Sequence, residues 1–100
     1  SMISAGCIIS GARVNKSLIF SNCKIHSYSK IEESLILPEC EVHDGCTIRR
    51  GIIDRGCVIA EGTEIGVSHD DDRARGFRVT EGGITLVTPG MLEQPLHHTR

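Results

Sequence analysis

The sequence repeats itself every seventeen residues, and this period restricts the possible folds more than any other feature of the chain. The segment 17–20 (SLIF) recurs as 34–37 (SLIL) and again as 51–54 (GIID). Other positions keep the same step, namely Cys23, Cys40 and Cys57; Ile25, Val42 and Ile59; and Ile31, Ile48 and Ile65. A fixed period of this length is typical of a solenoid, in which each repeat forms one supersecondary unit and stacks on its neighbours.

Each repeat contains three short segments in which a small residue precedes an aliphatic residue by two positions. The small positions are Ser17, Ser34 and Gly51; Cys23, Cys40 and Cys57; and Ser29, Cys46 and Thr63. Residues two apart share a face of an extended strand, so both members of each pair point into the solenoid. The many β-branched residues, the period of two and the glycines at the expected corners argue against an amphipathic helix.

The sequence therefore predicts an all-β fold, a left-handed parallel β-helix of the hexapeptide type with three short strands in each coil. A shorter turn of sixteen residues precedes the three repeats, with inward pairs at positions 1 and 3, 7 and 9, and 12 and 14. Together with the three repeats, this turn gives about four coils. Neighbouring strands in each sheet then come from successive coils. We expect residues 1–66 to form the coils.

Residues 67–100 are expected to close the last coil within the same domain, because the end of a solenoid otherwise leaves backbone groups unpaired. Residues 68–73 (SHDDDR) have the composition of a charged loop, and residues 84–87 (ITLV) that of a short strand. In the segment 88–92 (TPGML), Thr88 and Pro89 suit the N-cap and the first position of a short helical turn.

The composition argues against several classes of function. A net charge of −2 over 100 residues gives no reason to expect nucleic acid or an anionic membrane surface as a partner. No apolar run is long enough to span a bilayer and no signal peptide is evident, so we expect a cytoplasmic protein. The five cysteines include no CxxC pair, and four of them stand in inward columns, which indicates reduced core residues.

The columns also assign the outward side chains, and one face of the expected prism is apolar. Its outward residues are Leu18, Phe20, Leu35, Leu37 and Ile52. Aligned apolar residues make a contiguous patch, and such a patch marks an interaction surface more often than scattered ones do. One interpretation is that the C-terminal tail covers this apolar face; we favour the docking of another domain or subunit.

Most outward charges have an opposite charge one coil away and are expected to form modest surface ion pairs. These pairs are Glu32 with Arg49, Glu33 with Arg50, and Lys24 with Glu41. Arg55 differs, because its column neighbours are Ser21 and Pro38 and the ladder gives it no acidic partner. Such an arginine is either simply solvated or available to an anion, above all to phosphate.

Two histidines, His26 and His43, fall in one outward column and are expected to stack about 5 Å apart. They could hold a metal ion weakly, but the sequence shows no third ligand beside them, so we interpret them as surface residues. Residues 70–72 (DDD) are interpreted as part of a solvated loop rather than as a cation site. No metal site and no catalytic residue is expected.

Several segments resemble one enzyme family closely. They are residues 49–66 (RRGIIDRGCVIAEGTEIG), 71–77 (DDRARGF), 80–87 (TEGGITLV) and 34–38 (SLILP). The chain resembles, over essentially its whole length, the C-terminal β-helix domain of bacterial glucose-1-phosphate adenylyltransferase, also called ADP-glucose pyrophosphorylase. The resemblance implies a parent enzyme that makes ADP-glucose and pyrophosphate from ATP and glucose 1-phosphate for glycogen or starch synthesis.

In that family the catalytic chemistry belongs to an N-terminal α/β domain with a glycine-rich nucleotide loop and acids that bind Mg²⁺. This chain contains no GxGxxG or P-loop pattern. We therefore expect a C-terminal fragment without cofactor of its own and without adenylyltransferase activity.

The resemblance further implies assembly into a homotetramer and a share in effector sites between domains. Sugar phosphates act there as activators, and AMP or phosphate as inhibitors. The position of Arg55 is basic in the family and contributes to effector binding. Pro89 stands where the family commonly has a basic residue, and Glu93 stands near a further basic position of relatives activated by fructose 1,6-bisphosphate. These departures put the usual activator response in doubt.

Two other classes remain open from the sequence. One is a trimeric hexapeptide acyltransferase in which His26 or His43 would serve as the base. The other is a purely structural oligomerisation module, which is compatible with the role implied by the resemblance. The oligomeric state distinguishes them, since a trimer favours the acyltransferase.

Overall fold

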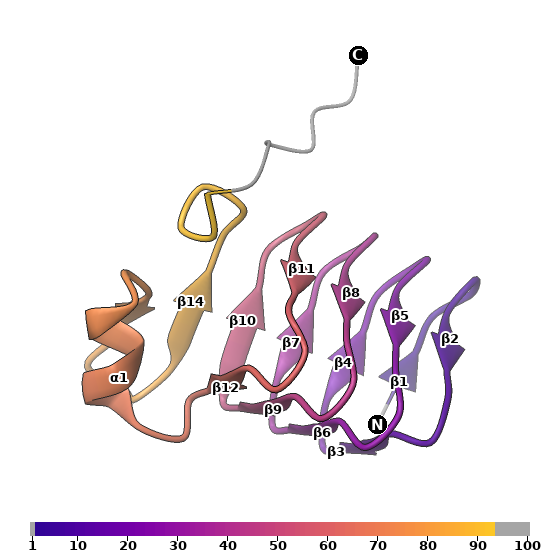
Figure 1. The fold of residues 1–100 in the computed structure, drawn as a ribbon. Helices are drawn as coiled ribbons and strands as arrows, with labels where there is room; N and C mark the ends of the chain where they lie inside the picture. Colours follow the sequence, from indigo (N-terminus) through magenta and orange to yellow (C-terminus); the bar gives the residue numbers. More distant parts are fainter. Residues whose placement is uncertain (1, 94–100) are drawn as a thin grey trace.

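The computed structural model describes residues 2–93, which form a parallel β-solenoid of about four coils closed at one end by a short helix and two added strands (Figure 1). The coils stack in chain order, and three sheets run along the stack. The first sheet contains, in spatial order, β1 (Met2–Ile3), β4 (Leu18–Ile19), β7 (Leu35–Ile36), β10 (Gly51–Ile53), β14 (Thr85–Val87) and β13 (Arg78–Val79). The all-β, three-stranded coil predicted from the repeat is confirmed.

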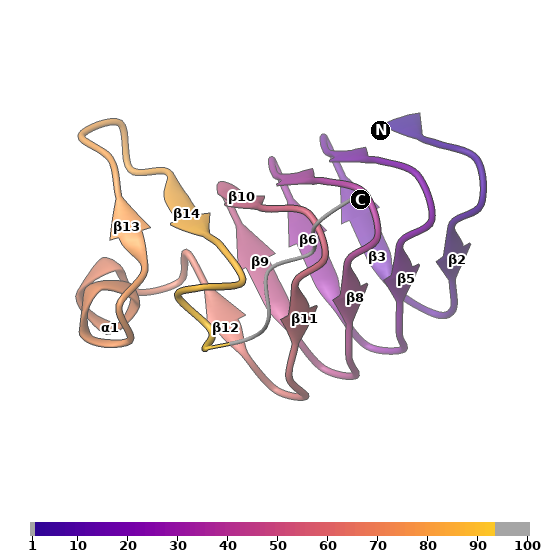
Figure 2. The ribbon, with the colours of Figure 1, turned by 90° about the horizontal axis from the view of Figure 1, so that it is seen from above.

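The other two sheets contain four strands each, one from each coil. The second sheet contains β2 (Ile8–Ile9), β5 (Lys24–Ile25), β8 (Glu41–Val42) and β11 (Val58–Ile59). The third contains β3 (Arg13–Asn15), β6 (Lys30–Glu32), β9 (Thr47–Arg49) and β12 (Glu64–Ile65). Seen from above, these strands form successive rungs of one stack (Figure 2).

The register is the one that the seventeen-residue period predicts. Ile19 pairs with Ile36, and Ile36 with Ile53, in the first sheet. The aliphatic columns of the three repeats are at most 1% exposed and fill the centre of the solenoid, at Ile19, Ile36 and Ile53; Ile25, Val42 and Ile59; and Ile31, Ile48 and Ile65. Because each buried aliphatic side chain of this size stabilises the fold by about 1.5–3 kcal/mol, these columns are the main source of stability.

The small columns bond from one coil to the next. The backbone N–H of Ser34 donates to Ser17 Oγ at 3.0 Å, and that of Gly51 donates to Ser34 Oγ at 3.1 Å. In the cysteine column, Cys40 Sγ donates to the carbonyl of Asp54 at 2.9 Å. A small polar side chain therefore fits where the chain turns into the solenoid, and it also forms a hydrogen bond with a backbone group of the neighbouring coil.

Residues 68–73 are not the charged loop that the composition indicated. They form most of helix α1 (His69–Ala74), whose N-cap is Ser68. The Ser68 side chain accepts a hydrogen bond from the backbone N–H of Asp71, and three aspartates stand in the first turn. Carboxylates there are stabilised by the unpaired N–H groups and the dipole of the helix, so the same charges that indicated a loop favour a helix start.

The end of the last coil is covered by strands as well as by the helix. β14 pairs in parallel with β10, and its three residues lie within the segment 84–87 that was predicted as a short strand. β13, which pairs with β14 in the antiparallel sense, was not expected from the sequence. The segment 88–93 is a hydrogen-bonded turn rather than a helix, although Thr88 Oγ1 accepts from the Met91 N–H as a cap would.

Residues 94–100 of the expected capping segment lie outside the described residues. Within residues 2–93, no helix is long and apolar enough to cross a membrane.

Candidate functional site

The apolar face predicted from the columns lies on the first sheet. Leu18 and Phe20 are 39% and 37% exposed, and Leu35, Leu37 and Ile52 are half-buried. Leu18 pairs with Leu35, and Leu35 with Ile52, so their side chains form one continuous row across β4, β7 and β10. The row lies on a sheet whose backbone is bonded on both sides, and it is therefore presented rigidly.

Strand β14 lengthens this apolar face instead of covering it. Leu86 lies in register with Ile52 and adds one more apolar position to the row. A shallow groove of about 310 Å³ runs along the row and is lined by Leu18, Leu35, Ile52 and Ile84, with charged side chains of Lys16, Glu33 and Arg50 at its edge. Among the described residues, the C-terminal segment therefore adds to the apolar face and does not cover it.

Arg55 has an acidic partner, so the expectation that the ladder leaves it without one is wrong. Its Nη2 and Nε donate to Glu39 Oε1 at 2.8 and 3.1 Å. Glu39 is not in the same column as Arg55 but sixteen residues earlier, at a corner where its backbone has a φ of 64°. The side chains of Arg55 and Glu39 are 49% and 35% exposed, so this is a surface pair open to solvent.

The remaining charge pairs follow the columns only in part. Arg49 and Glu32 form the expected ion pair at 3.5 Å. Arg50 donates from Nη2 to the carbonyl of Gly82 at 2.8 Å, which ties the last repeat to the capping segment. Lys24 lies in register with Glu41, but the carboxylate of Glu41 turns to the histidines.

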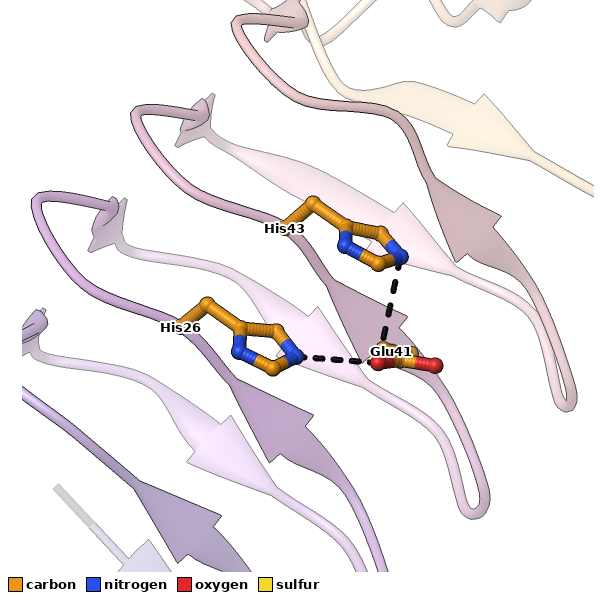
Figure 3. Close-up of side chains that lie close together, drawn as sticks. All are labelled: His26, Glu41 and His43. Atoms are coloured by element: carbon orange, nitrogen blue, oxygen red, sulfur yellow. Dashed lines mark hydrogen bonds and ion pairs between the residues drawn. The ribbon is translucent and has the colours of Figure 1, made fainter.

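His26 and His43 stack as predicted, with ring centroids 5.1 Å apart and planes inclined by 8°. The expectation that no third ligand lies near them is wrong, because Glu41 reaches both (Figure 3). His26 Nε2 donates to Glu41 Oε2 at 2.9 Å, and His43 Nε2 lies 3.8 Å from the same oxygen. The hydrogen bond from His26, with help from the nearby charges of His43 and Lys24, lowers the pKa of the Glu41 carboxyl.

The aspartates at 70–72 do not all belong to a solvated loop. Asp72 is completely buried and accepts hydrogen bonds from the Gly66 N–H, at 3.1 Å, and from Thr85 Oγ1, at 2.8 Å. Arg75 Nη2 lies 3.3 Å from its other oxygen. Asp72 is thus a structural residue that joins the last coil, helix α1 and β14.

Four cysteines are buried and free, as the columns predicted. They are Cys23, Cys40, Cys46 and Cys57. Burial raises the pKa of the Cys46 thiol. All four side chains lie in the hydrophobic core, and for Cys46 the raised pKa disfavours the thiolate, which is the reactive form.

Pro89 and Glu93 stand near the end of the described chain. Pro89 is buried, and Glu93 is exposed with a φ of 58°. Neither offers a positive charge to an anion.

The family comparison covers most of the chain. The model of the GlmU-like C-terminal hexapeptide family matches residues 1–87, which include all coils and β14. The match agrees with the parallel solenoid and its position-specific columns.

Individual curated proteins are similar to nearly the whole chain at high identity. Glucose-1-phosphate adenylyltransferase 2 of Pseudoalteromonas atlantica is 62% identical over 92 residues, which make up 92% of this chain and 22% of that protein. The glucose-1-phosphate adenylyltransferase of Saccharophagus degradans is 60% identical over 94 residues, or 94% of this chain and 22% of that protein. That of Shewanella oneidensis is 56% identical over 96 residues, or 96% of this chain and 23% of that protein.

The chain spans less than a quarter of the length of these relatives. Their names do not support the alternative of a trimeric acyltransferase. Together with the family match and the fold, these similarities show that the chain belongs to the GlmU-like C-terminal hexapeptide family, in the form found in bacterial glucose-1-phosphate adenylyltransferases.

Proposed function

We propose that the chain is the regulatory and assembly domain of a glucose-1-phosphate adenylyltransferase that works as a cytoplasmic homotetramer. The parent enzyme would make ADP-glucose and pyrophosphate from ATP and glucose 1-phosphate, with Mg²⁺ bound in a separate catalytic domain. Support comes from the names of the relatives and from their 56–62% identity to nearly all of this chain. The solenoid itself takes no part in the chemistry.

The observation that carries this proposal is the apolar face on the first sheet. Its side chains stand in one row on a rigid ladder, and the row extends from Leu18 to Leu86. Removing apolar surface from water stabilises a complex by roughly 25 cal/mol per Å², so such a row favours burial against another folded surface. The proposed occupants are the catalytic domain of the same chain and sister subunits.

We infer a second role for this domain, the binding of anionic effectors, in which Arg55 takes part. Its guanidinium group is half-exposed at a corner and, among residues 2–93, forms an ion pair with the carboxylate of Glu39. A phosphate group carries more charge than a carboxylate and accepts two parallel hydrogen bonds from a guanidinium group, so it can replace Glu39. Sugar phosphates, AMP and inorganic phosphate are the proposed ligands, and residues of a neighbouring domain would supply further positive charge.

The response to effectors should differ from that of many relatives. Pro89 is buried and Glu93 is negative, at or near positions where the resemblance implies basic residues. We therefore propose that the parent enzyme responds weakly, or to a different metabolite. Kinetics of the full-length enzyme with a panel of sugar phosphates test this, and strong activation by fructose 1,6-bisphosphate would contradict it.

The role in assembly is tested by the double variant Leu35→Asp/Leu37→Asp in the full-length enzyme. Two charges in the apolar row should shift the protein from the tetramer to smaller species in sedimentation velocity, because an unpaired buried charge is costly. Ile8→Asp is the matched control, since Ile8 is an exposed apolar residue on the second sheet. Unchanged sedimentation of the double variant would refute a role of this face in assembly.

A further inference from the structure

Three side chains that the proposed function does not use converge on the outer surface of the second sheet. His26 follows β5, Glu41 lies in β8, and His43 follows β8, so they come from two successive coils (Figure 3). The seventeen-residue repeat places the two histidines one above the other. Glu41 stands two positions before His43 and therefore on the same side of its strand.

The donor atoms are close enough to share one ion. One nitrogen from each imidazole and one oxygen of Glu41 all lie within 4.8 Å of one another. Both histidines approach the same oxygen, Oε2, through Nε2, at 2.9 and 3.8 Å. Ligands around a tetrahedral zinc ion with bonds of 2.0–2.1 Å are about 3.3 Å apart, so the two distances lie on either side of the required value.

The surroundings suit a cation with open coordination positions. The side chains of His26, Glu41 and His43 are 39%, 35% and 41% exposed, so each can move by a fraction of an ångström and water can complete the shell. Lys24 lies in register with Glu41 on one side and weakens the site electrostatically, whereas Val58 on the other side carries no charge. The carboxylate is the one negative group that faces both imidazoles within the described cluster.

We propose that His26, Glu41 and His43 form a binding site for a divalent transition-metal ion of the zinc type. Two imidazoles and a carboxylate suit Zn²⁺, Ni²⁺ or Cu²⁺, whereas Mg²⁺ and Ca²⁺ prefer shells made entirely of oxygen. The ion binds the neutral His26 ring through Nε2, with the ring proton then on Nδ1, and binding weakens as the pH falls because protons compete with the metal for its ligands. Metal binding at this site is independent of the role proposed above.

Such an ion would join two neighbouring coils. Because the unfolded chain holds His26 and Glu41 far apart, the ion binds the folded state more tightly and stabilises it. The stabilisation should rise with the logarithm of the concentration of free metal once that concentration exceeds the dissociation constant.

The test is titration of the reduced chain with Zn²⁺ in a calorimeter, with Co²⁺ absorption as a second measurement. Cys7→Ser is introduced in all samples, because Cys7 is the described cysteine that is not fully buried. We expect His43→Gln and Glu41→Gln to weaken the binding of one equivalent of Zn²⁺ at least tenfold and to remove its stabilising effect on thermal unfolding. His69→Gln, on helix α1, is the matched control and should bind as the unchanged protein does.

The outcome is decisive in both directions. All three exchanged positions are exposed or half-buried, so circular dichroism should show an unchanged fold. Equal Zn²⁺ binding by the unchanged protein, His43→Gln and Glu41→Gln would overturn the proposal, as would an equal loss in His69→Gln. In either case the three side chains would serve only as a hydrogen-bonded surface cluster.

Discussion

The hydroxyl of Thr85 donates a hydrogen bond to the carboxylate of Asp72 at 2.8 Å, and both side chains are completely buried. The same carboxylate accepts the N–H of Gly66, at the end of the last coil. One buried acid thus joins the end of the last coil, helix α1 and β14. This arrangement closes the solenoid.

Asp72→Ala should destabilise the fold by about 3 kcal/mol, because it removes the acceptor of the buried Thr85 hydroxyl and of the half-buried Gly66 N–H. Urea unfolding measures this as a lower midpoint at an unchanged slope. Asp70→Ala is the control, since Asp70 lies on the same helix with a fully exposed side chain, and it should change the stability by less than about 0.5 kcal/mol. In a double-mutant cycle with Thr85→Val, additive effects would show that the two residues are not coupled.

Gly66→Ala should destabilise the fold far more than Gly62→Ala. Both glycines have positive φ, of 80° and 74°, a conformation that costs an L-residue about 1–2 kcal/mol. A Cβ at Gly66 would overlap the backbone carbonyl of Arg49, whereas a Cβ at Gly62 would meet nothing within 4 Å. We expect losses of at least about 3 and about 1 kcal/mol respectively in urea unfolding. Equal losses would mean that the turn at Gly66 moves freely.

Glu39→Gln and Arg55→Gln should change the affinity for anionic effectors in opposite directions. Removing the carboxylate frees Arg55 and should tighten binding about two- to fivefold, as expected from the small energy of a surface ion pair. Removing the guanidinium group should weaken binding about tenfold or more. The measurement is effector-dependent kinetics of the full-length enzyme, with Arg49→Gln, a similarly exposed arginine, as the control. An Arg55→Gln enzyme with unchanged effector constants would exclude this arginine from the site.

Glu41 should make part of the stability depend on pH. Its pKa is lowered in the folded state, chiefly by the hydrogen bond from His26, so the carboxylate stabilises the fold above its ordinary pKa of 4.5. This contribution is lost as the pH falls through the lower pKa of the folded state. The stability difference between the unchanged protein and Glu41→Gln should therefore shrink between pH 6 and pH 3 in metal-free buffer. A difference that stays constant over this range would contradict the assignment.

The core and the apolar face could be predicted from the sequence because a parallel ladder repeats each position directly above its counterpart. Once the period is known, Ile36 must lie between Ile19 and Ile53, and Leu35 between Leu18 and Ile52. Backbone hydrogen bonds fix this register, and a shift by one residue would expose every core side chain. The stacking of His26 on His43 follows from the same rule.

The charged contacts were less predictable because long side chains also reach diagonally. Arg55 meets Glu39, sixteen residues earlier, and His26 meets Glu41, fifteen residues later. Positions seventeen apart predict an ion pair of Glu41 with Lys24 and no acidic partner for Arg55. Which diagonal neighbour is chosen depends on rotamers and on the path of the backbone through each corner.

The sequence by itself thus determined the fold, the contents of the core and the apolar face, since these depend on a repeated pattern of small and aliphatic residues. Only the tertiary structure decided that Asp72 is buried, that Glu39 holds Arg55 and that Glu41 completes a cluster with two histidines. Periodic burial is encoded residue by residue along the chain. The partner of a polar side chain is selected among several nearby groups, and that selection exists only when the coils are stacked.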